Sequence, residues 1–388
     1  MTRHPAIAPL LVVGLAVAAP FARAADAVDT APPPPEAAAP AATPTATAEE
    51  IGSLRNAKVA IPRGAEAPTL TYFAYGLEPD EVAELQTLAP RVRIVNGLSR
   101  AEAVDRAAEA HAVDGFYATP EFLRAATNLV WVQATSAGVD RYVHVPELAG
   151  SDRIVLTNMR AVHGPAIADH VFAMLLALTR DLPVYLDRQA DGEWNRQGSG
   201  TLKPIALADR TLLVVGLGGI GTEIAQRGHG FGMRVIATRR SSAGAPAFVE
   251  RVGKPDELMA MLPEADVVAI AVPLTTETEG MFDAAAFAAM KPGSYLVNIA
   301  RGKVVRSDAL LEALRSGHLA GACLDVTDPE PLPSDDPLWR LPNVVITPHV
   351  AAMAELTQSR AWAVYRENLR RLDAGEPLLN VVDKSAEY

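Results

Sequence analysis

The chain has 388 residues, of which 49% are hydrophobic and 21% are charged, a composition typical of a globular protein with more than one buried core. Its formal net charge of −11 argues against a nucleic-acid partner, because phosphate binding needs a basic surface. The one cysteine, Cys323, excludes an intramolecular disulfide and a zinc site built on several thiolates. Cys323 stands in an apolar run, so we expect a buried structural thiol.

The first residues have the order of features found in a secretory signal peptide. A charged start, including Arg3, precedes an apolar run over residues 6–19, and Ala22-Arg23-Ala24 fits the small-residue cleavage rule. We predict a signal peptide over residues 1–24; an unstructured Ala-rich extension is the alternative. A real signal implies an exported or periplasmic protein, and otherwise a cytoplasmic one is expected. The apolar run is too short for a transmembrane helix, so no membrane span is expected in the mature chain.

Residues 25–50 are dominated by Ala, Pro and Thr, which predicts a disordered linker because such a segment buries too little apolar surface to order itself. From residue 51 to about residue 157, strand-like runs alternate with helical ones, which favours a parallel sheet with crossover helices. A helix is expected over residues 79–88. The strand-like runs include residues 70–73, 92–95, 115–117 and 129–132.

A long apolar helix is predicted over residues 165–179, and its composition suits packing between two domains. A second alternating series follows, with a last helix over about residues 351–372 that is expected to return to the first domain. Six strands in this series would make a complete Rossmann sheet. They are predicted over residues 211–216, 234–238, 267–272, 294–299, 321–326 and 344–347.

We therefore expect an α/β fold with two Rossmann-like domains, each a doubly wound parallel sheet. A substrate domain over residues 51–157, completed by residues 352–388, would flank an inserted dinucleotide-binding domain over residues 158–351.

The chain from Leu212 to Gly221 runs from an apolar strand directly into a helix and contains three glycines at fingerprint spacing. The first glycine makes the turn, the second lets the backbone approach a pyrophosphate, and the third lets helix and strand pack closely. The pyrophosphate would lie on the N–H groups at the helix start. A tight structural turn is the alternative for the glycine pattern alone. The residues predicted to bind a dinucleotide here are Gly216, Gly218, Gly219, Ile220 and Gly221.

The end of the next strand indicates which cofactor is bound. A site that prefers NAD places a carboxylate about 20 residues after the loop, at the ribose hydroxyls. Here the strand ends in Thr238-Arg239-Arg240, with no acid. Two guanidinium groups attract a 2′-phosphate, which a carboxylate would repel. We predict that Arg239 and Arg240 select NADP, with NAD as the second option; the alternative is that both are solvated surface charges.

Three residues that follow strands fit the chemistry of ketone reduction. This reaction needs a proton donor at the developing alkoxide and a cation for the carboxylate and the carbonyl oxygen. Arg301, Glu330 and His349 each follow one of the last three predicted strands, and the carboxyl ends of strands carry the site in an open α/β sheet. Each alone has a simpler interpretation, as a surface arginine, a turn acid and a core histidine.

With these residues in place, the chain resembles the D-isomer-specific 2-hydroxyacid dehydrogenases. The resemblance covers roughly residues 110–370, and the residues before 110 match poorly. The segments that carry it are residues 215–225, 272–275, 290–306, 321–333 and 347–349.

The resemblance implies an NAD(P)-dependent enzyme, similar to glyoxylate and hydroxypyruvate reductases, that transfers a hydride between the cofactor and a small 2-oxo or 2-hydroxy acid. Arg301 would bind the substrate carboxylate and carbonyl oxygen, His349 would be the general acid/base, and Glu330 would orient His349. A homodimer is implied as well. The resemblance also places Ala137 and Gly138 at the substrate, and Pro273, Ala300 and Asp325 at the cofactor.

Two other classes of protein stay open from the sequence. A Rossmann-fold nucleotide sensor or interaction protein without turnover would share the glycine loop, although a sensor is expected to lack at least one of the three catalytic candidates. A secreted interaction protein without a cofactor is suggested only by residues 1–48. No metal site is predicted.

Overall fold

The computed structural model describes residues 69–388 except 199, 201–203 and 242–243. The predicted signal peptide, the predicted linker and residues 51–68 of the predicted substrate domain lie outside the described residues. All described residues belong to one compact unit.

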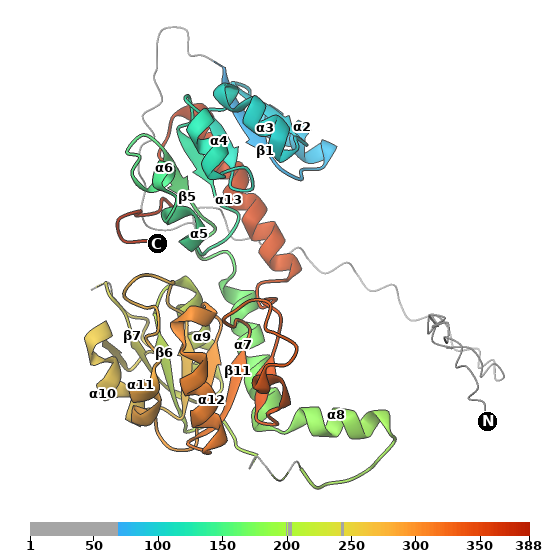
Figure 1. Cartoon of the computed structure of the whole chain (residues 1–388), viewed down its shortest axis with the longest axis vertical. Coiled ribbons are helices and arrows are strands. Elements are labelled where there is room, and N and C mark those ends of the chain that lie inside the picture. Colours follow the sequence, from blue (N-terminus) through green and yellow to red (C-terminus); the bar gives the residue numbers. More distant parts are fainter. Residues whose placement is uncertain (1–68, 199, 201–203, 242–243) are drawn as a thin grey trace, which may run out of the picture. The chain divides into compact units, whose positions relative to one another are not determined.

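Five parallel strands form a first sheet in the order β2-β1-β3-β4-β5. Figure 1 labels β1 and β5 of this sheet. All five residues of β1 are buried, as expected for a parallel sheet that is covered on both faces. The strands are β1 (Leu70–Ala74), β2 (Val92–Asn96), β3 (Ala112–Asp114), β4 (Trp131–Gln133) and β5 (Val155–Thr157). Their connecting helices are α2 (Pro79–Leu88), α3 (Arg100–Asp105), α4 (Pro120–Ala125), α5 (Asp140–Val143) and α6 (Pro146–Ala149).

Seven parallel strands form a second sheet in the order β12-β11-β10-β9-β6-β7-β8, so the strand order reverses between β6 and β9. The strands are β6 (Thr211–Val215), β7 (Arg234–Thr238), β8 (Arg251–Gly253), β9 (Val267–Ile270), β10 (Ser294–Asn298), β11 (Leu319–Leu324) and β12 (Val344–Ile346). Its helices are α7 (Gly164–Thr179), α8 (Leu182–Ala190), α9 (Gly219–Gly230), α10 (Leu258–Met261), α11 (Ala284–Ala289) and α12 (Ser307–Arg315).

Helices cover both faces of the second sheet (Figure 1). Leu212 and Val214 of β6 pack in one core with residues of α7 and α9. Leu213 and Val215 of the same strand pack in the other core with residues of α10, α11 and α12. Successive side chains of a strand point to opposite faces, so the unbroken apolar run of β6 is explained by two cores. This is the doubly wound arrangement predicted from the sequence.

The last helix, α13 (Glu355–Ala374), packs on the first sheet. The ring of Tyr365 lies 5.7 Å from the ring of Tyr72 in β1, at an interplanar angle of 85°, and Leu369 is buried in the same core. The expected return of this helix is confirmed. The first sheet with α2–α6 and α13 is called the first lobe below, and the second sheet with α7–α12 is called the second lobe.

Three short segments differ from the sequence-based prediction. Residues 115–117 form a turn instead of a strand, and the adjacent strand is β3, three residues earlier; the Asp114 side chain accepts a hydrogen bond from the Phe116 N–H (2.8 Å) and so stabilises the turn. Two strands were not predicted, β5 in the first sheet and β8 in the second, and β8 brings the second sheet from six strands to seven. Strands of three residues are too short to show a periodic apolar pattern.

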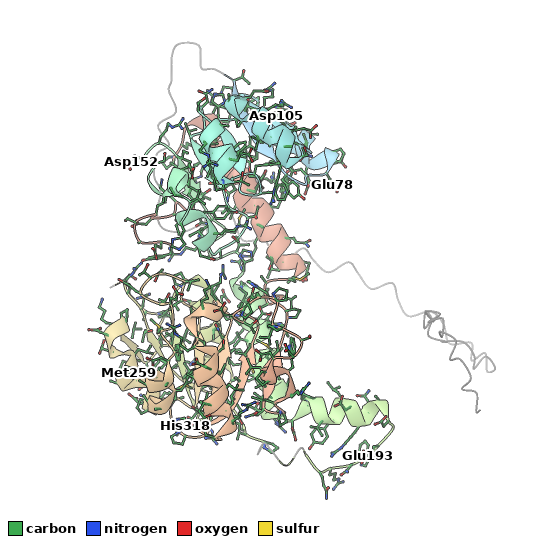
Figure 2. The ribbon with its side chains drawn as sticks, viewed as in Figure 1. Glu78, Asp105, Asp152, Glu193, Met259 and His318 are labelled. Atoms are coloured by element: carbon green, nitrogen blue, oxygen red, sulfur yellow. The ribbon has the colours of Figure 1, made fainter. Side chains whose placement is uncertain are left out.

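Acidic side chains lie on the outside of the described part of the chain, among them Glu78, Asp105, Asp152 and Glu193 (Figure 2). Cys323 is fully buried in β11, as expected, and burial raises the pKa of its thiol. Among the described residues no helix has the length and apolarity that crossing a membrane requires.

Asp114 is a carboxyl group in the core of the first lobe, with 3% of its surface exposed. Burial raises its pKa from 3.8 to about 6, against the opposing effects of the Phe116 N–H bond and the Arg141 charge. A pKa that is higher in the folded than in the unfolded state favours folding below the unfolded value. That contribution is lost as the pH rises through the folded value.

We predict that Asp114→Asn increases the free energy of unfolding by up to about 3 kcal/mol at pH 8. The reason is that folding raises the pKa of Asp114 from 3.8 to about 6, so the buried carboxylate destabilises the folded state at pH 8. The amide keeps the acceptor for Phe116 but removes the buried charge. Urea unfolding at pH 4 and pH 8 measures the effect, with Asp152→Asn on the surface as control. An equal difference at both pH values would contradict this explanation.

Candidate active site

The turn between β6 and α9 carries the glycine loop. Gly216 has a φ of +102°, and a Cβ there would lie 2.7 Å from the Ala271 carbonyl oxygen. A Cβ on Gly221 would lie 2.0 Å from the Gly216 carbonyl oxygen, so helix and strand meet too closely for a side chain. At Gly218, the N-cap of the 12-residue helix α9, a Cβ would meet nothing within 4 Å. The loop thus offers open backbone at a helix N-terminus, which suits a pyrophosphate.

Arg239 and Arg240 lie next to this loop, since the Leu217 N–H donates to the Thr238 carbonyl at the end of β7 (2.9 Å). The Arg239 guanidinium donates to the Gly244 carbonyl (3.2 Å). The Arg240 guanidinium has its carbon 4.2 Å from the centre of the Tyr388 ring. Both cations stand at the carboxyl end of β7, at the edge of the sheet that carries the glycine loop.

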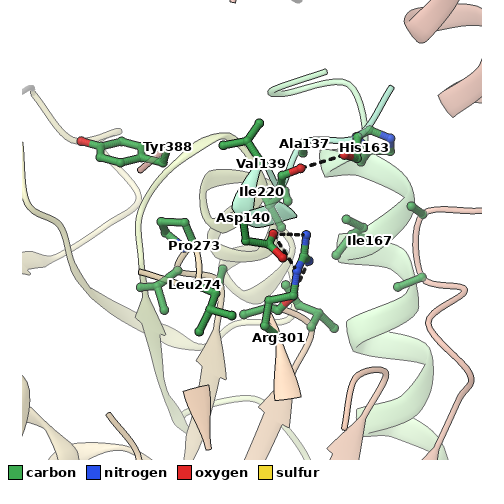
Figure 3. A pocket seen from close by; sticks show the side chains of 18 of the residues that line it. Ala137, Val139, Asp140, His163, Ile167, Ile220, Pro273, Leu274, Arg301 and Tyr388 are labelled. Atoms are coloured by element: carbon green, nitrogen blue, oxygen red, sulfur yellow. Dashed lines mark hydrogen bonds and ion pairs between the residues drawn. The ribbon is translucent and has the colours of Figure 1, made fainter. Parts of the chain in front are cut away.

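A cavity of about 220 Å³ lies beside the crossover between β6 and β9 (Figure 3). It is lined by residues of both lobes, including the loop 136–140 after β4 and the ends of β9, β10 and β11. The predicted site residues that line it are Ala137, Gly138, Ile220, Pro273, Ala300, Arg301, Asp325 and His349. Glu330 is outside the lining but is hydrogen-bonded to His349. Gly216, Gly218, Gly219, Gly221, Arg239 and Arg240 are not part of the lining.

Arg301 joins the two lobes at this cavity (Figure 3). Its Nε and Nη2 donate to Asp140 Oδ1 at 3.2 and 3.0 Å, and its Nη1 donates to the Ala300 carbonyl (2.8 Å). A Cβ on Gly138 would lie 1.8 Å from Arg301 Nη2. Glycine at position 138 is therefore what lets the guanidinium lie against the backbone of the 136–140 loop.

The turn that carries Arg301 packs closely against the loop that carries Glu330. Asn298 Oδ1 accepts from the Ala300 N–H (3.0 Å), and Asn298 Nδ2 donates to the Arg301 carbonyl (3.1 Å). The next residue, Gly302, approaches the backbone of Thr327 so closely that a Cβ would lie 1.9 Å from the Thr327 carbonyl carbon. Contact between these two backbones fixes the relative position of the two loops.

Glu330 connects that loop to His349. Its Oε1 accepts from the Thr327 N–H (3.1 Å), and its Oε2 is 3.0 Å from His349 Nδ1. Each carboxylate oxygen therefore has its own partner. Because Nδ1 is engaged, Nε2 is the ring nitrogen left for proton transfer. The side chains of His349 and Glu330 are 49% and 40% exposed, so the pair is open to a substrate and to solvent.

Asp325 holds the backbone around His349. Its carboxylate accepts from the N–H groups of Val350 (2.9 Å) and Ala351 (3.1 Å) and from the Thr347 hydroxyl (2.7 Å). The His349 N–H donates to the Asp325 carbonyl (2.8 Å). His349 has a φ of +55°, a conformation uncommon outside glycine that persists where surrounding bonds fix it. The buried carboxylate thus shapes the loop that presents the imidazole.

Three groups at the cavity were missed as site residues by sequence reasoning. Asp140 pairs with Arg301 across the lobes, and its place in the 136–140 loop was the available signal. His163, at the start of α7, lines the cavity, and burial lowers its pKa. Glu387 and Tyr388 also line it. Their distance in sequence from every recognised motif left no signal for them.

Comparison with known proteins shows which family the chain is related to. Residues 172–351 match the family model for the NAD binding domain of D-isomer specific 2-hydroxyacid dehydrogenases. The chain is 38% identical over 269 residues to the glyoxylate reductase of Korarchaeum cryptofilum, an alignment that covers 68% of this chain and 79% of that protein.

Solved structures are similar over most of the chain. A D-isomer specific 2-hydroxyacid dehydrogenase family protein from Aeromonas salmonicida has a TM-score of 0.70 and 34% identity, covering 81% of this chain and 99% of that one. A D-isomer specific 2-hydroxyacid dehydrogenase from Xanthobacter autotrophicus, solved in complex with NADPH and MES, has a TM-score of 0.70 and 30% identity, covering 83% and 100%. The chain therefore belongs to the D-isomer specific 2-hydroxyacid dehydrogenase family, as the resemblance in its motifs had indicated.

Proposed function

We propose that this protein transfers a hydride between NADPH and a small 2-oxo acid of the glyoxylate or hydroxypyruvate kind, forming the 2-hydroxy acid. The observation that carries the proposal is the gathering of Arg301, of His349 with its partner Glu330, and of the 136–140 loop around one cavity beside the glycine loop. The similarity to a glyoxylate reductase supports the substrate class, and the relative solved with NADPH supports the cofactor.

In this proposal Arg301 binds the substrate carboxylate and polarises the carbonyl. Its guanidinium has more N–H donors than its bonds to Asp140 and Ala300 use. It can therefore keep the contact with Asp140 while it binds a carboxylate in its own plane. The N–H groups of Ala137 and Gly138 stand on the loop that faces this guanidinium, and we assign them to the same carboxylate.

His349 is assigned as the general acid. Reduced nicotinamide, when bound, supplies a hydride to the carbonyl carbon, and the carbonyl oxygen then needs a proton. Protonated His349 donates that proton through Nε2, while Glu330 holds Nδ1 and stabilises the positive charge of the ring before transfer. The same residues work in reverse for oxidation, with neutral His349 as the base.

The cofactor is assigned to the edge of the second sheet at the crossover between β6 and β9. The backbone of Gly216, Gly218, Gly219, Ile220 and Gly221 would hold the pyrophosphate, Arg239 and Arg240 the 2′-phosphate, and Pro273, Ala300 and Asp325 would lie near the rest of the dinucleotide. The open backbone at Gly218 fits this role.

Further parts of the prediction belong to the same proposal. We assign residues 51–157 with 352–388 to the substrate domain and residues 158–351 to the dinucleotide-binding domain. We also propose a homodimer, since Leu186 and Trp194 near α8 are 60% and 94% exposed and exposed apolar groups favour association. The export signal over residues 1–24 is a proposal as well. Sedimentation and the mass of the secreted protein test these last two.

The reaction itself is tested by a panel of glyoxylate, hydroxypyruvate, pyruvate and phenylpyruvate with NADPH and NADH. Oxidation of NADPH with at least one of the small acids is expected. Absence of turnover with all four acids and both cofactors would reject the reaction.

We predict that His349→Gln lowers kcat for ketone reduction by about 10²–10⁴, the usual contribution of a positioned acid. Affinity for NADPH, followed by nicotinamide fluorescence, should stay nearly unchanged. His318→Gln is the control, because His318 lies just before β11, at its amino end, where its Nε2 bonds the Met290 carbonyl (3.0 Å). Wild-type turnover in His349→Gln would remove His349 from the reaction.

Gly138→Ala should lower kcat/KM for the 2-oxo acid by about 10²-fold, since a displacement of about 1 Å in a substrate-binding group has that cost. The new methyl group would displace the Arg301 guanidinium, which is the end of a flexible side chain, so the melting temperature should change little. Gly150→Ala is the control, because a Cβ there would lie 3.4 Å from the Pro146 carbonyl oxygen, an ordinary van der Waals contact. Unchanged kinetics in Gly138→Ala would contradict the assigned position of Arg301.

Arg239→Asp should shift cofactor preference from NADPH toward NADH. Each charge-assisted contact with the 2′-phosphate contributes roughly 1.5–3 kcal/mol, and an acid at this position repels the phosphate and accepts bonds from ribose hydroxyls. Titration of wild type and variant with both reduced cofactors measures the change. Equal wild-type affinities for NADPH and NADH would reject the cofactor assignment and leave the reaction type standing.

A further inference from the structure

The segment 383–388, called the strap below, is anchored to the first lobe. The Val382 N–H donates to the Leu156 carbonyl in β5 (2.8 Å). The strap therefore begins beside the edge strand of the first sheet. Lys384 Nζ donates to the carbonyls of Leu148 (2.9 Å), Ile154 (3.0 Å) and Ser151. An ammonium group with three carbonyl partners fixes the start of the strap.

The strap then folds into a turn built on Asp383. Asp383 Oδ1 accepts from the N–H groups of Ser385 and Ala386, each at 3.1 Å. The Tyr388 N–H donates to the Asp383 carbonyl (3.3 Å), and the Asp383 N–H donates to the Tyr388 carbonyl (3.1 Å). Glu387, at the tip of the turn, has a φ of +63°. The turn determines where the last two side chains point.

Those two side chains contact the second lobe. Glu387 Oε2 accepts from the Thr276 N–H (3.0 Å), in the loop after β9. The Tyr388 ring lies 4.2 Å from the guanidinium carbon of Arg240, just after β7. It also lies 5.9 Å from the guanidinium carbon of Arg160, in the segment that joins β5 to α7. Both residues also line the cavity that holds Arg301 and His349, and Figure 3 shows Tyr388 among the lining side chains. The strap therefore connects the first lobe to a cation of the proposed 2′-phosphate site.

We propose that Tyr388 is a positioning residue for Arg240 and thereby increases selectivity for the phosphorylated dinucleotide. This inference rests on the proposed use of NADPH. The aromatic ring holds the flat face of the guanidinium, whereas a phosphate binds the N–H groups in the plane of the guanidinium. Stacking and phosphate binding use different parts of the same group, so both contacts can exist together.

The other contacts of Arg240 agree with this role. Its ion pair with Glu277 is loose, at 3.7 Å, and the Glu277 side chain is 78% exposed, so a phosphate can replace the carboxylate at little cost. Lys254 Nζ donates to the Arg240 carbonyl (3.3 Å), which steadies the backbone. A long side chain that is already held loses less conformational freedom on binding. NADH lacks the 2′-phosphate that Arg240 would bind, so the gain in affinity applies to NADPH.

The test compares the dissociation constants of NADPH and NADH in the full chain, measured by nicotinamide fluorescence without substrate. Tyr388→Ala should weaken NADPH binding by about 3- to 10-fold, the usual effect of a partly exposed cation–π contact, and leave NADH binding unchanged. Tyr388→Phe keeps the ring and should bind both cofactors as wild type does. Tyr185→Ala is the control, because it removes a tyrosine ring beside another arginine, Arg188 (6.0 Å), in α8 and outside the cavity lining.

Titration with 2′-AMP, which carries the phosphate without the nicotinamide, should show the same loss in Tyr388→Ala. An unchanged ratio of NADPH to NADH affinity in Tyr388→Ala would overturn the proposal. An equal loss of affinity for both cofactors would also overturn it, because the ring would then contribute to binding of the dinucleotide in general and not to binding of the 2′-phosphate. Tighter binding of both cofactors would also overturn it, because the ring would then occupy their place. The wild-type ratio alone tests the cofactor assignment, so the two failures are distinguishable.

Discussion

The contact of the Arg301 guanidinium with the 136–140 loop is the constraint on which the site depends. The cation comes from the end of β10 in one sheet, and Asp140 and Gly138 come from the loop after β4 in the other. Neither charge is fully exposed, and leaving one of them unpaired there would be costly. The two lobes therefore have to meet at this point, and the cavity forms where they do.

Around that contact, backbone geometry does most of the positioning. Gly302 lies against Thr327, Thr327 binds Glu330, and Glu330 binds His349. Asp325 fixes the loop on which His349 stands. A displacement of any one loop would be transmitted to the imidazole and to the guanidinium. This interdependence gives the His349–Glu330 pair a defined geometry, although both side chains are 40% or more exposed.

The strap also connects the two lobes, at the side of the cavity where we propose that the cofactor binds. Lys384 anchors it in the first lobe, and Glu387 bonds the Thr276 N–H in the second. Because Tyr388 both contacts Arg240 and lines the cavity, the proposed role of this ring links cofactor choice to the contact between the lobes. Arg240 is a cation whose surroundings come in part from outside its own sheet, since the Tyr388 ring lies on it.

The sequence by itself determined the class of fold and most of the candidate site. Apolar strands alternating with helices predict a doubly wound sheet, and glycines at fixed spacing after β6 predict the dinucleotide loop, because these are local requirements of backbone and burial. Arg301, Glu330 and His349 were recognisable since each follows a strand. The sequence analysis missed the three-residue strands β5 and β8 and the turn at 115–117. Segments this short show no periodic pattern of apolar residues.

Only the tertiary structure decided which residues meet across the chain. The pairing of Arg301 with Asp140 joins positions 161 residues apart, and the contact of Thr276 with Glu387 joins positions 111 apart. No local pattern marks such partners, because a hydrogen bond between lobes depends on how two sheets face one another. The same reason hid Tyr388, whose role follows from the cation that it meets and not from its neighbours in sequence.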